Sequence, residues 1–247
     1  MSAALVALLC AVMVATAFLS GVFGMAGGLI LMGVLLMLMP LPAAMMLHGV
    51  TQMASNGWRA FLWRAHIQWR SVGFYMVGCA VALGLWSLVS YTPTRPIALL
   101  FLGLSPFVVR LAPASLKPDP GNLLHGTIFG ALCTSLMLLT GVSGPLLDTY
   151  FLGGMFDRKQ LVATKAICQV FGHLMKLIYF GGIVAEVGTL DPVMVGLAIA
   201  ASMLGTTLAR RVLEAMTDAQ FRRYADRLIL AIATYYVGHA TWLLAMT

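Results

Sequence analysis

The fold of this chain is decided by the stretch Gly21-Val22-Phe23-Gly24-Met25-Ala26-Gly27-Gly28 and by a second one, Gly141-Val142-Ser143-Gly144-Pro145. Each stretch interrupts a long apolar run and contains no charged residue. Glycine weakens a helix interior and permits tight turns and close backbone approach. We therefore expect the chain to reverse direction at both glycine clusters, so that each cluster forms the tip of a helical hairpin.

The composition around the clusters is typical of a helical membrane protein. Of the 247 residues, 61% are hydrophobic and 9% are charged, whereas a soluble domain carries roughly 25% charged residues. The apolar runs are long enough to cross a bilayer, which takes about 20 helical residues for each crossing. The sequence thus excludes a soluble enzyme and predicts an all-α polytopic membrane protein.

Ten apolar segments follow one another along the chain. They cover residues 3–22, 24–39, 43–64, 70–90, 95–112, 123–140, 144–156, 160–182, 191–209 and 226–246. Segments 24–39 and 144–156 are short, so they either span the membrane or stop partway. The expected fold is a single membrane domain of two inverted repeats, residues 1–117 and 118–247, with eight long helices plus short or re-entrant segments.

The positions of Lys and Arg support a reversal at both clusters. With unbroken helices, four basic loop residues lie on one face and eight on the other. With reversals, Arg95 stands alone on one face, and the other face holds Arg64, Arg70, Arg110, Lys117, Arg158, Lys159, Arg210, Arg211, Arg222, Arg223 and Arg227. Basic loops mark the cytoplasmic side. The sequence therefore predicts that both termini lie outside the cytoplasm.

A weak internal repeat supports the division into halves. At an offset of 117 residues the glycine clusters align, and polar positions inside the apolar segments coincide: Gln52 with Gln169, Asn56 with His173, and Arg59 with Lys176. Because each half has an odd number of segments, the halves lie in opposite orientations. Inverted repeats with broken helices are typical of secondary transporters.

Two segments carry a polar stripe. Its members are three or four residues apart, which places them on one helical face; they are His48, Gln52, Ser55, Asn56 and Arg59 in 43–64, and Lys165, Gln169, Gly172, His173 and Lys176 in 160–182. Ionisable residues inside a membrane usually face a bundle interior or an aqueous path. The stripes therefore predict a central site.

Simpler roles stay open for several stripe residues. Arg59 and Lys176 lie about one and a half turns from a segment end and can extend to the lipid headgroups. Gln52 and Gln169 can serve as hydrogen-bonding contacts between helices. The pattern favours a structural role for His48.

Asp148 is the one acid in the interior of an apolar segment, and Lys165 is its expected partner. We interpret this pair as structural, with proton uptake during transport as the alternative.

A helix that begins at either glycine cluster would present free N–H groups and partial positive charge, which suit an anion. The alternative is that the glycines only permit close helix packing. The residues expected to contribute to such a site are Gly24, Ala26, Gly27, Gly141, Ser143 and Gly144.

Two stretches resemble the repeats of the TauE/SafE family of sulfite and organosulfonate exporters. The stretch from Phe18 to Gly28 resembles the first repeat, and the stretch from Thr140 to Pro145, with Gln169 and His173 downstream, resembles the second. The resemblance spans nearly the whole chain. It implies passage of small sulfur-containing anions, such as sulfite, sulfoacetate or thiosulfate, across the bacterial inner membrane.

We therefore expect a secondary transporter that works by alternating access, without a metal or other cofactor. In this hypothesis Gln52, Asn56, Gln169 and His173 donate hydrogen bonds, and Arg59 and Lys176 supply charge. A passive anion channel is the first alternative, and an intramembrane redox enzyme is the second. The expected partners are the anion and membrane lipid, not nucleic acid; proton coupling and a homodimer stay open.

Overall fold

The computed structural model describes residues 2–23, 26–111, 113, 118–151, 156–184, 190–215 and 218–246. Helices account for nearly all of this part of the chain, which contains no strand. Gly24 of the expected site and Lys117 of the expected basic face lie outside the described residues.

Ten α-helices correspond to the ten predicted segments. They are α1 Ala3–Phe23, α2 Ala26–Leu38, α3 Leu41–Leu62, α4 Trp69–Val89, α5 Arg95–Leu111, α6 Leu123–Thr140, α7 Gly144–Phe151, α8 Arg158–Ile178, α9 Pro192–Ala215 and α10 Asp218–Ala245. A short 3₁₀ turn, η1 (Arg64–His66), follows α3, and a π-helical turn, η2 (Tyr179–Ile183), extends α8. The two short segments expected at the glycine clusters are α2, with 13 residues, and α7, with 8.

Local sequence explains several helix ends. Pro42 stands in the first turn of α3, where its missing N–H costs nothing. The side chain of Asn122 caps α6, and Asp157 forms a capping box with Gln160 at the start of α8. Gly141 ends α6 with φ of 84°, a left-handed conformation that glycine adopts without strain. The second cluster therefore breaks the chain as its composition predicts.

Six helical spans in the described residues are long and apolar enough to cross a membrane. They are α1, α4, α6, α8 together with η2, and most of α9 and of α10. Large apolar side chains such as Leu88 and Leu111 are exposed on the outside of the bundle, which suits contact with lipid.

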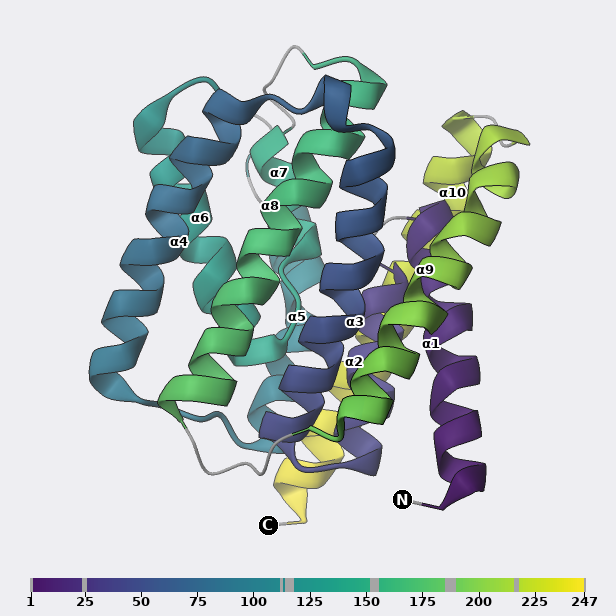
Figure 1. The fold of residues 1–247 in the computed structure, drawn as a ribbon. Coiled ribbons are helices and arrows are strands. Elements are labelled where there is room, and N and C mark those ends of the chain that lie inside the picture. The colour runs from purple at the N-terminus through teal and green to yellow at the C-terminus, as the bar shows by residue number, and fades with distance from the viewer. Residues whose placement is uncertain are drawn as a thin grey trace.

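The chain alternates direction along the bundle, and both termini lie at the same end (Figure 1). It reverses between α1 and α2 and again between α6 and α7, at the two glycine clusters. The connections at the end opposite the termini join α3 to α4, α5 to α6, α7 to α8 and α9 to α10. These connections and the adjoining helix ends hold most of the described residues of the expected basic face, whereas Arg227 lies well inside α10. Arg95 begins α5 at the end where the termini lie.

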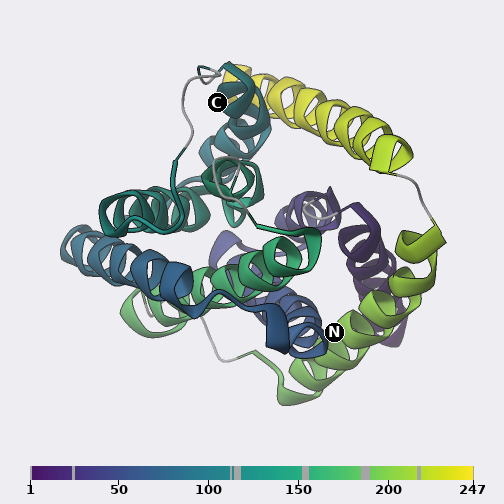
Figure 2. The ribbon, with the colours of Figure 1, turned by 90° about the horizontal axis from the view of Figure 1, so that it is seen from above.

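Four helix pairs make the most extensive contacts: α4 with α6, α1 with α9, α3 with α8, and α5 with α10. Each pair joins one of the first five helices to one of the last five. Seen from above, α3 and α8 lie between the α1–α9 pair and the α4–α6 pair (Figure 2). The two helices with polar stripes therefore meet in the middle of the bundle.

Glycines allow the two flanking pairs to pack closely. A Cβ atom added at Gly78 of α4 would overlap the carbonyl oxygen of Thr127 in α6, and one added at Gly205 of α9 would overlap that of Val14 in α1. Small residues let helix backbones approach in this way inside membranes.

Candidate functional site

Lys176 of α8 lies fully buried at the centre of the bundle. Its Nζ is 2.8 Å from His48 Nδ1 on α3 and donates to the carbonyl oxygen of Gly141 at 3.0 Å. This position excludes the simpler role in which the lysine extends to the headgroups. The ammonium group instead joins α8, α3 and the second glycine cluster.

His48 connects this lysine to the first glycine cluster. Its Nε2 lies 3.0 Å from the carbonyl oxygen of Gly28. A carbonyl oxygen only accepts hydrogen bonds, so Nε2 carries a proton, and Nδ1 of the neutral ring is left to accept from Lys176. The sequence pattern had favoured a purely structural role for His48, whereas the structure places it in direct contact with the central cation.

Lys176 has no carboxylate partner among the described residues. Asp148 forms an ion pair with Lys165, the partner expected from the sequence. An ammonium group removed from water without a counter-charge is costly. A bound anion would supply the counter-charge that the ammonium form of Lys176 lacks here.

Seven buried side-chain atoms have no hydrogen-bond partner in the described part of the chain, and three of them lie on residues of the expected site: Gln52 Nε2, Ser143 Oγ and His173 Nδ1. Buried polar groups are nearly always hydrogen-bonded, and each one left unpaired costs about 1–3 kcal/mol. Three such atoms in one region are therefore a sign of a ligand site.

All three atoms belong to residues near the His48–Lys176 contact. Gln52 lies one turn from His48, and its Oε1 would be 3.4 Å from a Cβ added at Gly28. The ring of His173, one turn from Lys176, has its centroid 5.5 Å from that of His48. Ser143 is two residues beyond the carbonyl that accepts from Lys176.

Ser143 stands immediately before α7, where a serine usually caps the helix through its hydroxyl. Its Oγ is buried yet makes no such bond within the described structure. The first turn of α7, which begins at Gly144, therefore keeps partial positive charge. An anion at this helix N-terminus remains a prediction, now with an uncommitted hydroxyl beside it.

The remaining stripe residues are placed differently. Gln169 is buried one turn from His173, and Asn56 donates to the carbonyl oxygen of Gln52 in its own helix at 2.9 Å. Arg59 donates through Nη2 to the carbonyl oxygen of Ser20 at 3.0 Å. Arg59 is 11 residues from His48, or about 16 Å along the helix at 1.5 Å per residue. The structure therefore separates the two cations that were expected to share one site.

The described glycines of the start of α2 have two roles: Gly27 packs against α1, and Gly28 contacts the site. A Cβ atom at Gly27 would overlap the carbonyl oxygen of Thr16, so this glycine brings α2 against α1. Ala26, the first residue of α2, is fully buried. Gly28 faces Gln52 and binds His48 through its carbonyl oxygen.

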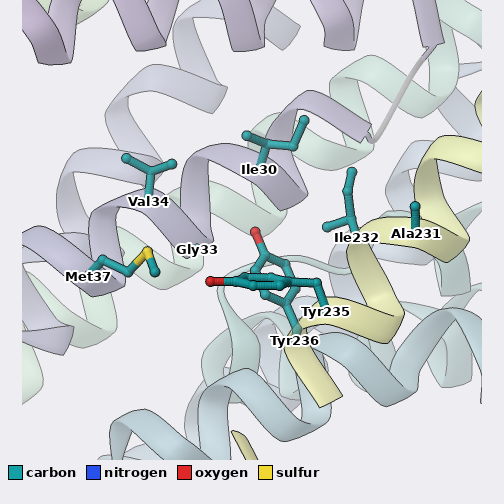
Figure 3. Close-up of a pocket in the computed structure, with 8 residues that line it drawn as sticks. All are labelled: Ile30, Gly33, Val34, Met37, Ala231, Ile232, Tyr235 and Tyr236. Carbon is teal, nitrogen blue, oxygen red and sulfur yellow. The ribbon is translucent and has the colours of Figure 1, made fainter. Parts of the chain in front are cut away.

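A separate cavity of about 330 Å³ lies between α2 and α10 (Figure 3). Its walls are Ile30, Gly33, Val34, Met37, Ala231, Ile232, Tyr235 and Tyr236. None of these side chains is charged, and the hydroxyl of Tyr236 already donates to the carbonyl oxygen of Leu29 at 2.8 Å. The cavity therefore offers little to an anion and is not part of the site around Lys176.

The ten-helix bundle and its lipid-facing apolar surface define a multi-pass membrane protein with a buried lysine at its centre. The family model described as "Sulfite exporter TauE/SafE" matches residues 8–236, which is nearly the whole chain. The protein belongs to this family, and membership indicates a membrane transporter for anions such as sulfite rather than an enzyme. No significant match was found among curated proteins or solved structures.

Proposed function

We propose that this protein is a secondary transporter that exports small sulfur-containing anions, such as sulfite or organosulfonates, across the bacterial inner membrane. The observation that carries the proposal is the buried Lys176, which has neutral hydrogen-bond partners and no carboxylate among the described residues.

The anion would accept hydrogen bonds from both halves of the chain. Lys176 uses two of its three N–H groups on His48 and Gly141, which leaves one for a ligand. Gln52, Ser143 and His173 add the uncommitted atoms described above. A sulfur oxyanion has several acceptor oxygens around one centre, and hydrogen bonds to an ionised acceptor are roughly twice as strong as neutral ones.

The pattern of helix pairs supports an inverted repeat with α1–α5 and α6–α10 as its units. If α1 corresponds to α6, α4 to α9 and so on, the α4–α6 pair corresponds to the α9–α1 pair. The α3–α8 and α5–α10 pairs each correspond to themselves. A two-fold relation between the units would produce this pattern, and the proposed boundary between them lies between residues 117 and 118.

This arrangement supports alternating access as the mechanism. His48 and Lys176 are fully buried, and Gln52, Gln169 and His173 are at most 8% exposed, so this conformation is closed around the site. In the proposed cycle one repeat moves against the other and opens the site to each side in turn. The basic end of the bundle would face the cytoplasm and both termini the periplasm.

Flux measurements in proteoliposomes test the proposal. Radiolabelled sulfite, thiosulfate and sulfoacetate are offered to the wild type and to the variants Q52A, Q169A and Q68A, of which Q68A makes the same change outside the site. We expect Q52A and Q169A to reduce saturable flux about tenfold, the effect of losing about 1.4 kcal/mol of binding, and Q68A to leave it unchanged. If Q52A and Q169A fold normally and carry sulfite at the wild-type rate, the proposed site is wrong.

The same vesicles separate a carrier from a passive anion channel. A carrier exchanges labelled anion against unlabelled anion on the other side, and its flux saturates. A channel shows neither property. The closed surroundings of Lys176 favour the carrier, because an open pore would leave the ammonium group accessible to water.

A further inference from the structure

One hydrogen bond joins His48 Nδ1 to Lys176 Nζ, so one proton lies between these two nitrogen atoms. Nε2 of His48 is committed to the Gly28 carbonyl, so Nδ1 is the only ring nitrogen that can change its protonation. It faces Lys176 Nζ at 2.8 Å. With Lys176 in the ammonium form that the proposed anion site requires, Nζ donates and Nδ1 accepts, so the pair holds one positive charge.

A second proton on this pair needs a negative charge beside it. Protonated Nδ1 and the ammonium group would be two donors, with only the Gly141 carbonyl as an acceptor between them. They would also be two like charges at close range in a buried site, where repulsion is strong. An anion placed between them would accept from both and offset the added charge.

We propose that His48 and Lys176 form the proton site of the transporter, so that binding of an anion at Lys176 brings a proton onto His48 Nδ1 and each anion crosses the membrane with one proton. No covalent bond changes: the proton comes from water on the loading side and returns to water on the other. The inference rests on the proposed anion site and adds the coupled ion.

The surroundings of His48 leave few other groups to take this proton. α3 packs against α8, α9, α2, α1 and η2. From α8 the facing groups are His173 and Lys176, and from η2 the group is Tyr179, whose hydroxyl donates to the carbonyl oxygen of Tyr91 at 2.7 Å. α2 contains no titratable residue, and α1 contains only Cys10.

The remaining charges lie away from His48. Arg59, on α3 itself, is held by Ser20. The ionisable residues of α9 are Arg210, Arg211 and Glu214, in its last two turns. Lys165 and Asp148 neutralise each other three turns along α8. His173 is therefore the main competitor, and the experiment includes it.

Linkage fixes the direction of the pH effect. In the proposed scheme the anion-bound protein holds one proton more than the empty protein, so lowering the pH favours anion binding. For one linked proton the apparent affinity changes by at most about tenfold per pH unit, and by reciprocity the anion promotes protonation to the same degree.

The experiment measures anion flux and proton movement together in the same proteoliposomes. Proteoliposomes that contain the whole chain are loaded with a pH-sensitive dye. They are then given a gradient of thiosulfate, whose charge is constant near neutral pH, or of sulfite. The variants are H48Q, H173Q and H239Q; H239Q makes the same change on α10, where the ring contacts Tyr235 and Trp242. Glutamine can replace both hydrogen bonds of His48 but cannot take up a proton.

We expect wild type and H239Q to move about one proton per anion and to gain affinity about tenfold per pH unit. H48Q should lose the proton movement that accompanies each anion, and the flux that it retains should show less than about a twofold pH effect. For sulfite, the difference between wild type and H48Q removes the proton that the anion itself carries.

Each other outcome has a definite meaning. If wild type moves anion but no proton, or if H173Q rather than H48Q abolishes proton movement, the proton site is wrong and the anion site stands. If no anion of the panel shows saturable flux, the proposed function fails and the proton site with it. The wild-type measurement decides the matter even if H48Q does not fold.

Discussion

Two lysines on the same helix have opposite environments. Lys165 and Lys176 lie 11 residues apart on α8. Lys165 pairs with Asp148, and the two side chains are 18% and 40% exposed. Lys176 is fully buried and contacts only neutral groups, a histidine ring and a backbone carbonyl.

Lys165 therefore has a carboxylate partner, whereas Lys176 has none among the described residues. A partly exposed ion pair contributes little to stability, and its lysine already has a counter-charge, so it does not need an anionic ligand. A buried cation with neutral partners is destabilising until a negative charge arrives. Only the second arrangement lacks a counter-charge that an anion could supply, so we propose that the anion binds near Lys176 and that the region around Lys165 is structural.

The sharpest test of this comparison makes the same change at both lysines. We expect K176M to reduce sulfite flux in proteoliposomes by at least about 100-fold, because losing one partner of a buried charge pair costs 2–5 kcal/mol of binding. Its thermal stability should change little, because removal of the buried charge is offset by the loss of the donor to His48 Nδ1 and to the Gly141 carbonyl. K165M should keep flux within about twofold of wild type. Equal losses of flux in K176M and K165M would show that the two lysines do not differ in their role in transport.

A hydroxyl near the buried cation gives the next largest effect. We expect S143A to lower flux about tenfold, because the anion loses one donor, and to leave stability unchanged or higher, because an unpaired polar atom is removed. S202A is the matched control: its hydroxyl is fully buried and already donates to the carbonyl oxygen of Ala198 at 2.6 Å. A flux loss in S202A as large as in S143A would show that burial alone explains the result.

Much of the fold follows from the sequence for a simple reason. A bilayer accepts few structures other than helices, so hydropathy and the two glycine clusters suffice to predict ten helices, including the short α2 and α7. The ends of helices are less well predicted. The segments expected over 191–209 and 226–246 form α9 Pro192–Ala215 and α10 Asp218–Ala245, because a helix can continue through the charged residues at which an apolar run ends.

The contacts at the site were beyond sequence reasoning. The internal repeat aligns Arg59 with Lys176, but repeat alignment finds equivalent positions, not neighbours. Because α3 and α8 pack antiparallel, Gly57 lies near Val170 and Gly49 near Lys176, and the lysine meets His48. A broken helix also exposes carbonyls as well as N–H groups, and the carbonyls of Gly28 and Gly141 accept from the cationic pair.

The backbone that holds Lys176 can be disturbed without touching the lysine. In G141A the left-handed conformation costs about 1–2 kcal/mol, and the added Cβ would lie 2.5 Å from Met32 Sδ, so we expect a lower melting temperature and a several-fold loss of flux as the carbonyl shifts. G238A is the control, because its Cβ would meet nothing within 4 Å in α10. It should gain about 0.5–1 kcal/mol of stability with unchanged flux. Unchanged flux in G141A would argue against a role for the carbonyl.

We expect the smallest effect on flux and stability from a change at Asp148, which is also the most direct test of the difference between the two lysines. D148N removes the carboxylate from Lys165 but leaves both side chains partly in contact with solvent, so stability should fall by less than about 1 kcal/mol and flux should stay within about twofold. Thermal unfolding and sulfite flux of the same preparation check both. If D148N instead abolishes flux or the proton movement that accompanies it, the carboxylate belongs to the transport path. The proton would then be carried by Asp148 and Lys165 rather than by His48 and Lys176, and the apparent difference between the two lysines would reflect one step of a cycle in which both take part.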